Sequence, residues 1–170
     1  METKHPFVPV GFEPPLRLMR DAFSLEPLGP QHNEADYAAW SLSIPHIRAT
    51  PGYAEGAWPC EMSLADNLRD LESHANDFQD RRGFTYTVLD PADAGVIGCV
   101  YIYPCRAGAL NVAHDSELGG VELCGDRGEA SVRSWVRADR AGLDAPLWQA
   151  VSEWLREEWP FEHVAYAPRR

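Results

Sequence analysis

Lysine is almost absent from this sequence of 170 residues: Lys4 is the single lysine among 15 basic residues, which face 26 acidic ones. The formal net charge is -11 and the isoelectric point is about 4.9. Nucleic acids and anionic membranes are bound through a basic surface that displaces counterions. We therefore expect neither as a partner. The remaining positive charge sits on arginines, whose planar guanidinium groups suit bidentate contacts with carboxylates or phosphates.

Long apolar runs are also missing. No segment approaches the roughly 18 consecutive apolar residues that a membrane-spanning helix needs. Near the N-terminus, Pro6, Pro9, Pro14 and Pro15 interrupt every run that could act as a signal peptide. The sequence therefore predicts a cytoplasmic protein.

The four cysteines lack the spacing of a metal site or of a disulfide framework. No C-x-x-C pair occurs among Cys60, Cys99, Cys105 and Cys124. Structural zinc sites and small disulfide-stabilised domains both show regular cysteine spacings. We expect four reduced thiols and no bound metal.

Length and proline content predict the domain organisation. A chain of 170 residues can bury one substantial core, so we expect a single domain over residues 21–170. Residues 1–20 form a proline-rich arm, because proline interrupts both helices and central strands. The arm is either a loose tail or an extended segment laid across the body.

Hydrophobic periodicity predicts an α/β (α+β) order of strand, helix, helix, three strands, helix and strand. The expected strands cover residues 23–28, 84–88, 95–104, 132–136 and 163–168. The expected helices run from Asn33 to near Pro45, from Ser63 to about Arg81, and from about Leu147 to Glu158. Residues 45–60 and 105–130 are expected to be loops, with residues 121–124 as candidates for a short hairpin.

The segment from Ser131 to Pro160 combines a strand, a loop rich in Arg, Asp and Gly, and an amphipathic helix. Such a layout places the phosphate groups of a cofactor at a helix N-terminus, where backbone N–H groups are free to bind them. This segment therefore predicts a cofactor site.

The element order, together with the strand end Ser134-Trp135-Val136 and the strand Val96-Ile97-Gly98, resembles the GNAT superfamily of acetyl-CoA-dependent N-acyltransferases. The resemblance implies a mixed, mostly antiparallel sheet with helices on both faces. It also implies an N-acetyltransferase that transfers an acetyl group to a small-molecule amine. The usual last helix and strands of that family have no counterpart here.

The resemblance implies a cofactor site at the end of the fourth family strand. Pantetheine would run along residues 136–138 and the pyrophosphate would lie over residues 140–145. The implied cofactor-binding residues are Val136, Arg137, Ala138, Arg140, Ala141, Gly142, Leu143, Asp144 and Ala145.

A general base is needed to take a proton from the attacking amine. Ser131 stands where the family often has an acid, so the candidates come from the loop before it. They are chiefly Glu129 and Glu117, with Glu122 and His114 beside them. His32, His46 and His74 are expected to be surface or capping residues.

Three departures from the family pattern support an alternative. Leu143 stands where a glycine lets the backbone approach the pyrophosphate, and Asp144 is placed to cap the helix and occupy the N–H groups that phosphates need. Pro146 removes a further N–H donor. The alternative is a non-catalytic GNAT-like binding or structural module that has lost acetyl-CoA binding.

The C-terminal strand leaves an open sheet edge at residues 164–167, and open edges invite association. We expect a second subunit, in a homodimer, or the proline-rich arm to cover this edge.

Overall fold

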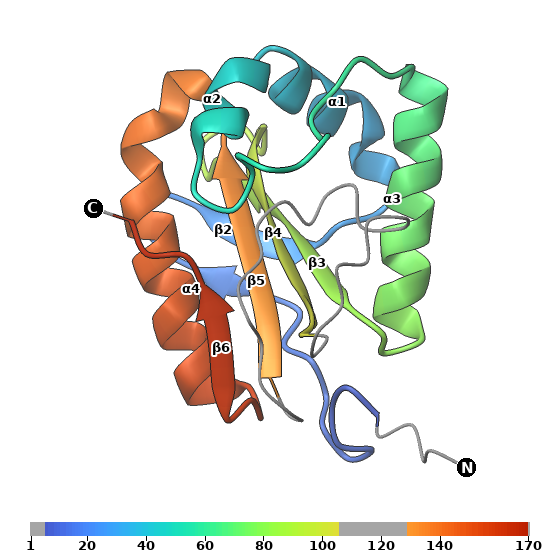
Figure 1. Cartoon of the computed structure of the whole chain (residues 1–170), viewed down its shortest axis with the longest axis vertical. Coiled ribbons are helices and arrows are strands. Elements are labelled where there is room, and N and C mark those ends of the chain that lie inside the picture. The colour runs from blue at the N-terminus through green and yellow to red at the C-terminus, as the bar shows by residue number, and fades with distance from the viewer. Residues whose placement is uncertain (1–5, 106–128, 170) are drawn as a thin grey trace.

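The computed structural model describes residues 6–105 and 129–169. Six strands form one sheet in the order β1-β2-β3-β4-β5-β6, antiparallel throughout except for the parallel pair β5 and β6 (Figure 1). The strands are β1 (Leu18–Met19), β2 (Ser24–Pro27), β3 (Phe84–Leu89), β4 (Val96–Pro104), β5 (Glu129–Val136) and β6 (His163–Tyr166). The helices are α1 (Asn33–Ser41), α2 (Ile44–Ala49), α3 (Leu64–Gln79) and α4 (Asp144–Glu158), with 3-10 turns η1 (Pro30–His32) and η2 (Ala138–Leu143). The predicted fold class is confirmed.

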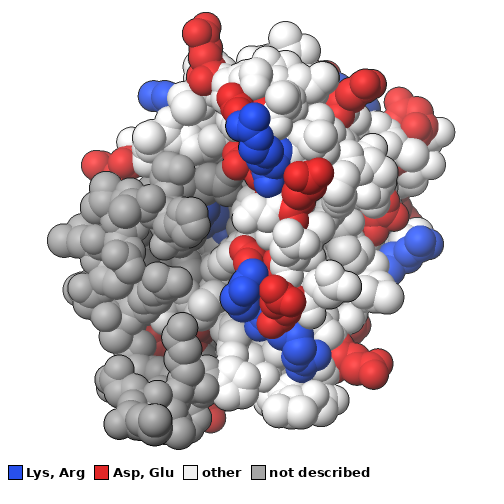
Figure 2. All heavy atoms as spheres, turned by 90° about the vertical axis from the view of Figure 1, so that its right-hand side faces the viewer, with Lys and Arg blue, Asp and Glu red and all other residues white. Residues whose placement is uncertain are grey.

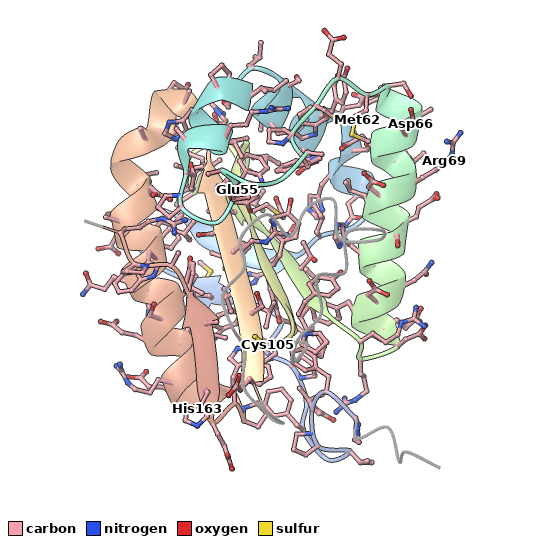
Figure 3. All side chains as sticks on the ribbon, viewed as in Figure 1. Glu55, Met62, Asp66, Arg69, Cys105 and His163 are labelled. Carbon is pink, nitrogen blue, oxygen red and sulfur yellow. The ribbon has the colours of Figure 1, made fainter. Side chains whose placement is uncertain are left out.

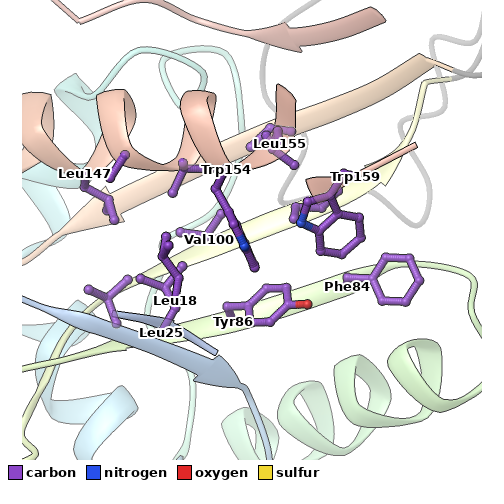
Figure 4. Close-up of a cluster of buried hydrophobic side chains, with 14 of the residues drawn as sticks. Leu18, Leu25, Phe84, Tyr86, Val100, Leu147, Trp154, Leu155 and Trp159 are labelled. Atoms are coloured by element: carbon purple, nitrogen blue, oxygen red, sulfur yellow. The ribbon is translucent and has the colours of Figure 1, made fainter. Parts of the chain in front are cut away.

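The sheet separates two hydrophobic clusters, because successive side chains of a strand point to opposite faces. Val100 of β4 packs with Leu147 and Trp154 of α4, and Figure 4 shows this cluster between α4 and the sheet. Tyr101, the next residue of β4, packs with Trp40 of α1 on the other face. Helices therefore cover both faces, as predicted, with α4 on one side and α1, α2 and α3 on the other.

Two strands differ from the expected bounds. β5 begins at Glu129 rather than at residue 132, because its first residues pair with both neighbours, β4 and β6. β1 was not predicted from the sequence: Leu18 and Met19 pair with Leu25 and Ser24. A two-residue strand depends on a partner strand and leaves no periodic pattern of its own.

The first predicted helix is split. α1 ends at Ser41 and α2 begins at Ile44, so the expectation that residues 45–49 belong to a loop is wrong. Pro45 lies in the first turn of α2, where a missing N–H costs nothing and the fixed φ suits a helix. Proline here starts a helix rather than ending one.

The helix α3 begins as the sequence predicts. The Ser63 hydroxyl accepts a hydrogen bond from the backbone N–H of Asp66 at 3.0 Å, which caps the helix N-terminus. The helix ends at Gln79, two residues before the predicted end, and Arg81 then adopts a left-handed φ of 61°. The left-handed residue that follows the helix is therefore Arg81.

The described part of the N-terminal arm, residues 6–20, lies across the body. Val8 is 1% exposed within the cluster that faces α4, and the Phe7 ring stacks on Phe84 at 5.9 Å. Arg81 donates to the carbonyl oxygens of Pro9 and Phe12 at 2.7 and 2.6 Å. Of the two arrangements expected for the arm, the structure shows the extended segment laid across the body.

Surface charges on the α3 side are mixed in sign. Figure 2 shows acidic and basic groups interspersed there, including the exposed pair Arg69–Asp66 at 2.6 Å. Within residues 6–105 and 129–169, no helix is long and apolar enough to cross a membrane.

The cysteines only partly follow the expectation. Cys60 and Cys99 form no disulfide, whereas Cys105 is disulfide-bonded, so the expectation of four reduced thiols is wrong. The described residues hold no cluster of three or more His, Cys, Asp or Glu side chains suited to a metal ion.

Candidate active site

The parallel strands β5 and β6 separate partway along their length. Their pairing runs over four residue pairs, from Glu129 opposite His163 to Val132 opposite Tyr166. β5 then continues to Val136, and Figure 1 shows it extending beyond the arrowhead of β6, towards the end where α4 begins. The last part of β5 thus has no strand partner on its β6 side within the described residues.

The Arg169 side chain occupies the place where the two strands separate. Its guanidinium donates to the carbonyl oxygen of Ser134 on β5 at 2.9 Å and to the carbonyl oxygen of Ala167 at 2.8 Å. Nε of Arg169 also pairs with the carboxylate of Asp144, in the first turn of α4, at 2.8 Å. The Arg169 side chain is only 3% exposed. One arginine therefore joins β5, the segment after β6 and the start of α4.

Beneath Arg169, the Tyr166 hydroxyl of β6 is hydrogen-bonded to Oγ of Ser134 on β5. Burial raises the pKa of the Tyr166 hydroxyl, and the hydrogen bond from Ser134 only partly offsets this. The phenol therefore stays protonated at neutral pH. Tyr166 and Arg169 together close the space between the separating strands.

The predicted cofactor loop is helical. Residues 138–143 form η2, in which the N–H of Arg140 binds the Arg137 carbonyl at 2.9 Å and the N–H of Asp144 binds the Ala141 carbonyl. The N–H of Ala138 donates to Oγ of Ser43 at 3.0 Å, which ties η2 to the junction between α1 and α2. These three backbone N–H groups are therefore already in use and are not available to a pyrophosphate.

The expectation that Asp144 caps α4 is wrong. Asp144 has helical dihedral angles (φ -62°, ψ -49°) and its carboxylate binds Arg169 instead of backbone N–H groups. The helical turn η2 precedes α4, so the true start of the helical segment lies several residues earlier. A guanidinium is also a stronger partner for a carboxylate than a neutral amide.

Carboxylates neutralise both arginines of this segment. Arg137 pairs with Asp139 at 2.6 Å, and Arg140 pairs with Asp90, from the β3–β4 turn, at 2.7 Å. The hydrogen bond from Arg137 lowers the pKa of Asp139. The Ala92 N–H and then the Arg140 side chain lower the pKa of Asp90. All four groups thus find partners within the chain.

A surface depression of about 650 Å³ lies beside η2, between this turn and the β3–β4 turn. Its wall includes Asp21, Asp90, Asp139 and Arg140. Three carboxylates face one guanidinium, which disfavours a phosphate group there. With Arg169 between the strands and the N–H groups engaged, these residues do not fit acetyl-CoA in the arrangement observed.

The other face of β5 carries a second group of polar and aromatic side chains. Arg133 lies under the loop after α2, with its guanidinium carbon 4.9 Å from the centre of the Tyr53 ring and 5.6 Å from that of Tyr101. Nearby, the Trp135 indole donates to the Tyr101 hydroxyl at 3.1 Å, and the Trp58 and Trp135 rings lie 6.0 Å apart. Arg133 was not predicted as a site residue, although an arginine within a largely apolar strand was a signal for it.

His74 joins the same face from α3. Its Nδ1 lies 2.7 Å from the Tyr103 hydroxyl and 3.1 Å from the Thr85 hydroxyl. The Tyr103 hydroxyl donates to Asp77 at 3.0 Å, so it accepts from His74. The expectation that His74 is a surface or capping residue is wrong, because α3 turns this side chain towards the sheet.

The predicted catalytic residues do not meet the predicted cofactor residues. Glu129 is the first residue of β5, opposite His163, whereas η2 follows the last residue of that strand. Seven residues of strand separate Glu129 from Val136, a span of about 23 Å. Figure 3 shows His163 and Cys105 at the same end of the sheet as the start of β5. Glu117, like Glu122 and His114, lies outside the described residues.

Of the predicted cofactor residues, Val136 ends β5 opposite Gly98 and is 1% exposed. The remaining ones lie in sequence through η2 into the first turn of α4, namely Arg137, Ala138, Arg140, Ala141, Gly142, Leu143, Asp144 and Ala145. The structure therefore brings these residues together next to the strand separation. Their role in binding a cofactor stays a prediction.

A mostly antiparallel sheet with one parallel pair that separates at the start of a helix is the architecture of the GNAT acyltransferases, and the chain has this fold. The structure is similar to RimL, the ribosomal L7/L12 alpha-N-protein acetyltransferase, with a TM-score of 0.60, 10% identity, and coverage of 89% of this chain and 68% of that one.

Two further solved structures are similar. The microcin C7 self-immunity acetyltransferase MccE, in complex with acetyl-CoA and AMP, has a TM-score of 0.57, 15% identity, and coverage of 81% and 63%. The ribosomal-protein-S5-alanine acetyltransferase from Vibrio fischeri has a TM-score of 0.55, 10% identity, and coverage of 83% and 67%. The chain thus spans about two thirds of these proteins. No family model and no curated protein matches the sequence, and identities this low establish the fold alone.

Proposed function

We propose that the protein is an acetyl-CoA-dependent N-acetyltransferase acting on an amine acceptor. The observation that carries the proposal is the separation of β5 from β6 after the pair Val132 and Tyr166, beside the start of α4. Similar structures include MccE with acetyl-CoA and RimL with coenzyme A, which supports the same cofactor here.

Cofactor binding requires a rearrangement. Arg169 would have to withdraw from Ser134 and Asp144 before another molecule could reach the free edge of β5. Arg169 follows the short segment after β6, so its withdrawal leaves the six strands in place. The observed state is then a closed form of the enzyme, and the Arg169–Asp144 pair is the contact that must open.

A specific observation favours a second candidate, a GNAT-like binding or structural module that does not use acetyl-CoA. Arg137, Arg140 and Arg169, the cations nearest to the predicted pyrophosphate position, each pair with a carboxylate of this chain. A protein that had lost its cofactor would gain stability from such internal pairing, since no phosphate would compete for these arginines.

Thermal unfolding with and without acetyl-CoA tests the proposal. A ligand at about 100 times its dissociation constant stabilises a protein by about 2.7 kcal/mol, which raises the unfolding temperature of a domain of this size by about 5 to 10 °C. Three variants accompany the wild type: Arg169→Ala, the double variant Arg169→Ala with Asp144→Asn, and Arg156→Ala on the exposed side of α4 as control. The double variant avoids a buried, unpaired carboxylate at Asp144.

An increase in the unfolding temperature of the wild type with acetyl-CoA would support the enzyme proposal. It would also mean that the cofactor can displace Arg169. A shift confined to the Arg169 variants also supports a retained cofactor site, one that is closed in the wild type. If neither the wild type nor these variants respond to millimolar acetyl-CoA, the enzyme proposal fails and the non-catalytic module stands. The Arg156 variant should match the wild type in every case.

A further inference from the structure

Arg133 is a buried cation in the middle of β5. It is 7% exposed and lies opposite Tyr101 of β4, on the face of the sheet that α1, α2 and α3 cover. The loop after α2 packs against its aliphatic stem: a Cβ added at Gly52 would lie 3.4 Å from Cγ of Arg133. Figure 1 shows this loop crossing the end of β5. The side chain is therefore held in place by its surroundings and is not a mobile surface group.

Two nitrogens of the Arg133 guanidinium lack a hydrogen-bond acceptor within the described residues. Within the described residues, Nε and Nη1 of Arg133 are buried and have no hydrogen-bond partner, and no ion pair involves this residue. The Tyr53 and Tyr101 rings flank the guanidinium and attract the cation through their π faces, but a ring face does not replace an acceptor in the guanidinium plane. A buried charge with unused donors is costly to the fold, so its presence points to a partner that supplies acceptors.

The missing partner has a defined chemistry. A guanidinium binds carboxylates and phosphates through two parallel N–H···O bonds, and an open donor remains on both sides of the Arg133 group. The rings of Tyr53, Trp58 and Trp135 beside the guanidinium are at most 6% exposed, so a ligand that reaches Arg133 would enter an apolar, largely buried environment. Because the chain has a net charge of -11, the protein as a whole does not attract an anion electrostatically. Binding of an anion must therefore depend on the Arg133 cation.

We propose that Arg133 binds the carboxylate or phosphate group of a small organic ligand on the face of β5 opposite α4. This binding site does not depend on acetyl-CoA. The identity of the ligand as the acceptor rests on the proposed function: the acceptor would then be an amine that also bears an anionic group. Cofactor and anion would approach β5 from different sides, since Arg169 contacts its edge and Arg133 projects from its face.

Titration with small aromatic anions, in the absence of acetyl-CoA, tests the site. The probes are benzoate, phenyl phosphate and neutral benzamide, followed through the fluorescence of Trp58 and Trp135. We expect saturable binding of benzoate or phenyl phosphate with benzamide at least about tenfold weaker, a difference that corresponds to one missing charged contact. Preference between the two anions identifies the carboxylate or the phosphate as the natural group.

Arg133→Met is the decisive variant, because methionine keeps the apolar stem and removes the donors. It should weaken binding of the anion at least about tenfold and leave benzamide unchanged, while Arg156→Met, an exposed control, matches the wild type. The unfolding temperature of Arg133→Met should equal or exceed that of the wild type, because the variant lacks the unpaired buried charge. If Arg133→Met does not fold, Arg133→Lys, which keeps the charge without the planar group, should still lose several-fold affinity.

Equal anion affinity in the wild type and the folded Arg133 variant would overturn the proposal, as would benzamide binding as tightly as the anions. The absence of saturable binding of either anion up to about 20 mM would overturn it too. Because acetyl-CoA is not used, failure here leaves the acetyltransferase proposal to its own thermal test.

Discussion

The carboxyl group of Asp90 shows how a single residue holds η2 against the sheet. It accepts from the Ala92 N–H at 2.8 Å and from Arg140 at 2.7 Å, and both bonds favour the ionised form. They lower the pKa of Asp90 below its ordinary value of 3.8. A depressed pKa means that the stabilising contribution is present above the unfolded-state pKa and is lost as the pH falls through the folded-state pKa.

We therefore predict that the stability advantage of the wild type over Asp90→Asn disappears as the pH falls below about 4. In Arg140→Ala the pKa of Asp90 should rise, yet stay below normal, because the larger cause, the Ala92 N–H, remains. Titration of the Asp90 carboxyl carbon by NMR measures both values. A wild-type pKa at or above the ordinary one would contradict the observed pairing.

Replacing Gly98 and replacing Gly142 by alanine should have opposite effects on stability. A Cβ at Gly98 in β4 would lie 2.1 Å from the carbonyl oxygen of Trp135 in β5, whereas a Cβ at Gly142 in η2 meets nothing within 4 Å. Gly98→Ala should therefore lower the free energy of unfolding by about 3 kcal/mol, because two paired backbones must move apart. Gly142→Ala should be neutral or raise it by about 0.5 to 1 kcal/mol. Denaturant unfolding of the two variants checks the contrast, and a similar loss in both would count against this register of β4 and β5.

At the scale of elements, the N-terminal arm is part of the core. Val8 is 1% exposed and Val10 is 88% exposed, although they are the same residue type two positions apart. Val8→Ala should lower the free energy of unfolding by about 2 kcal/mol through lost burial and a small cavity. Val10→Ala should change it by less than about 0.5 kcal/mol. Equal, small effects in chemical denaturation would mean that the arm does not pack in solution.

At the scale of the whole molecule, β6 is the outermost strand of the sheet within the described residues. Its Val164 is 38% exposed, and the arm packs against Phe161 before it rather than along its edge. Within the described residues, the arm does not pair with this edge, and the homodimer through β6 stays a prediction.

Light scattering should accordingly give the mass of a dimer for the wild type. Val164→Glu places a charge at the edge and should shift the protein to monomer without loss of helical signal. Leu42→Glu, at a position between α1 and α2 that is 83% exposed against 38% for Val164, should keep the dimer. A monomeric wild type at micromolar concentration would contradict the homodimer.

Sequence periodicity was sufficient for the order and type of most elements. The alternation of β4 and the Ser63 cap of α3 depend on neighbours a few residues away, so local sequence specifies them. The GNAT-like order of elements could be recognised for the same reason. Pro45 was misread because proline suits both the end of one helix and the first turn of the next.

Only the tertiary structure decided what the charged residues do. Asp144 was predicted to cap α4 and instead pairs with Arg169, and Arg140 pairs with Asp90. Arg133 lies against the Tyr53 ring. These partners lie 25 to 80 positions apart in the sequence, so no local pattern specifies them. The sequence alone thus determined the order and type of most elements. The packing of elements distant in sequence determined that Arg140 and Arg169 pair with carboxylates. It also determined that, within the described residues, two nitrogens of Arg133 have no acceptor.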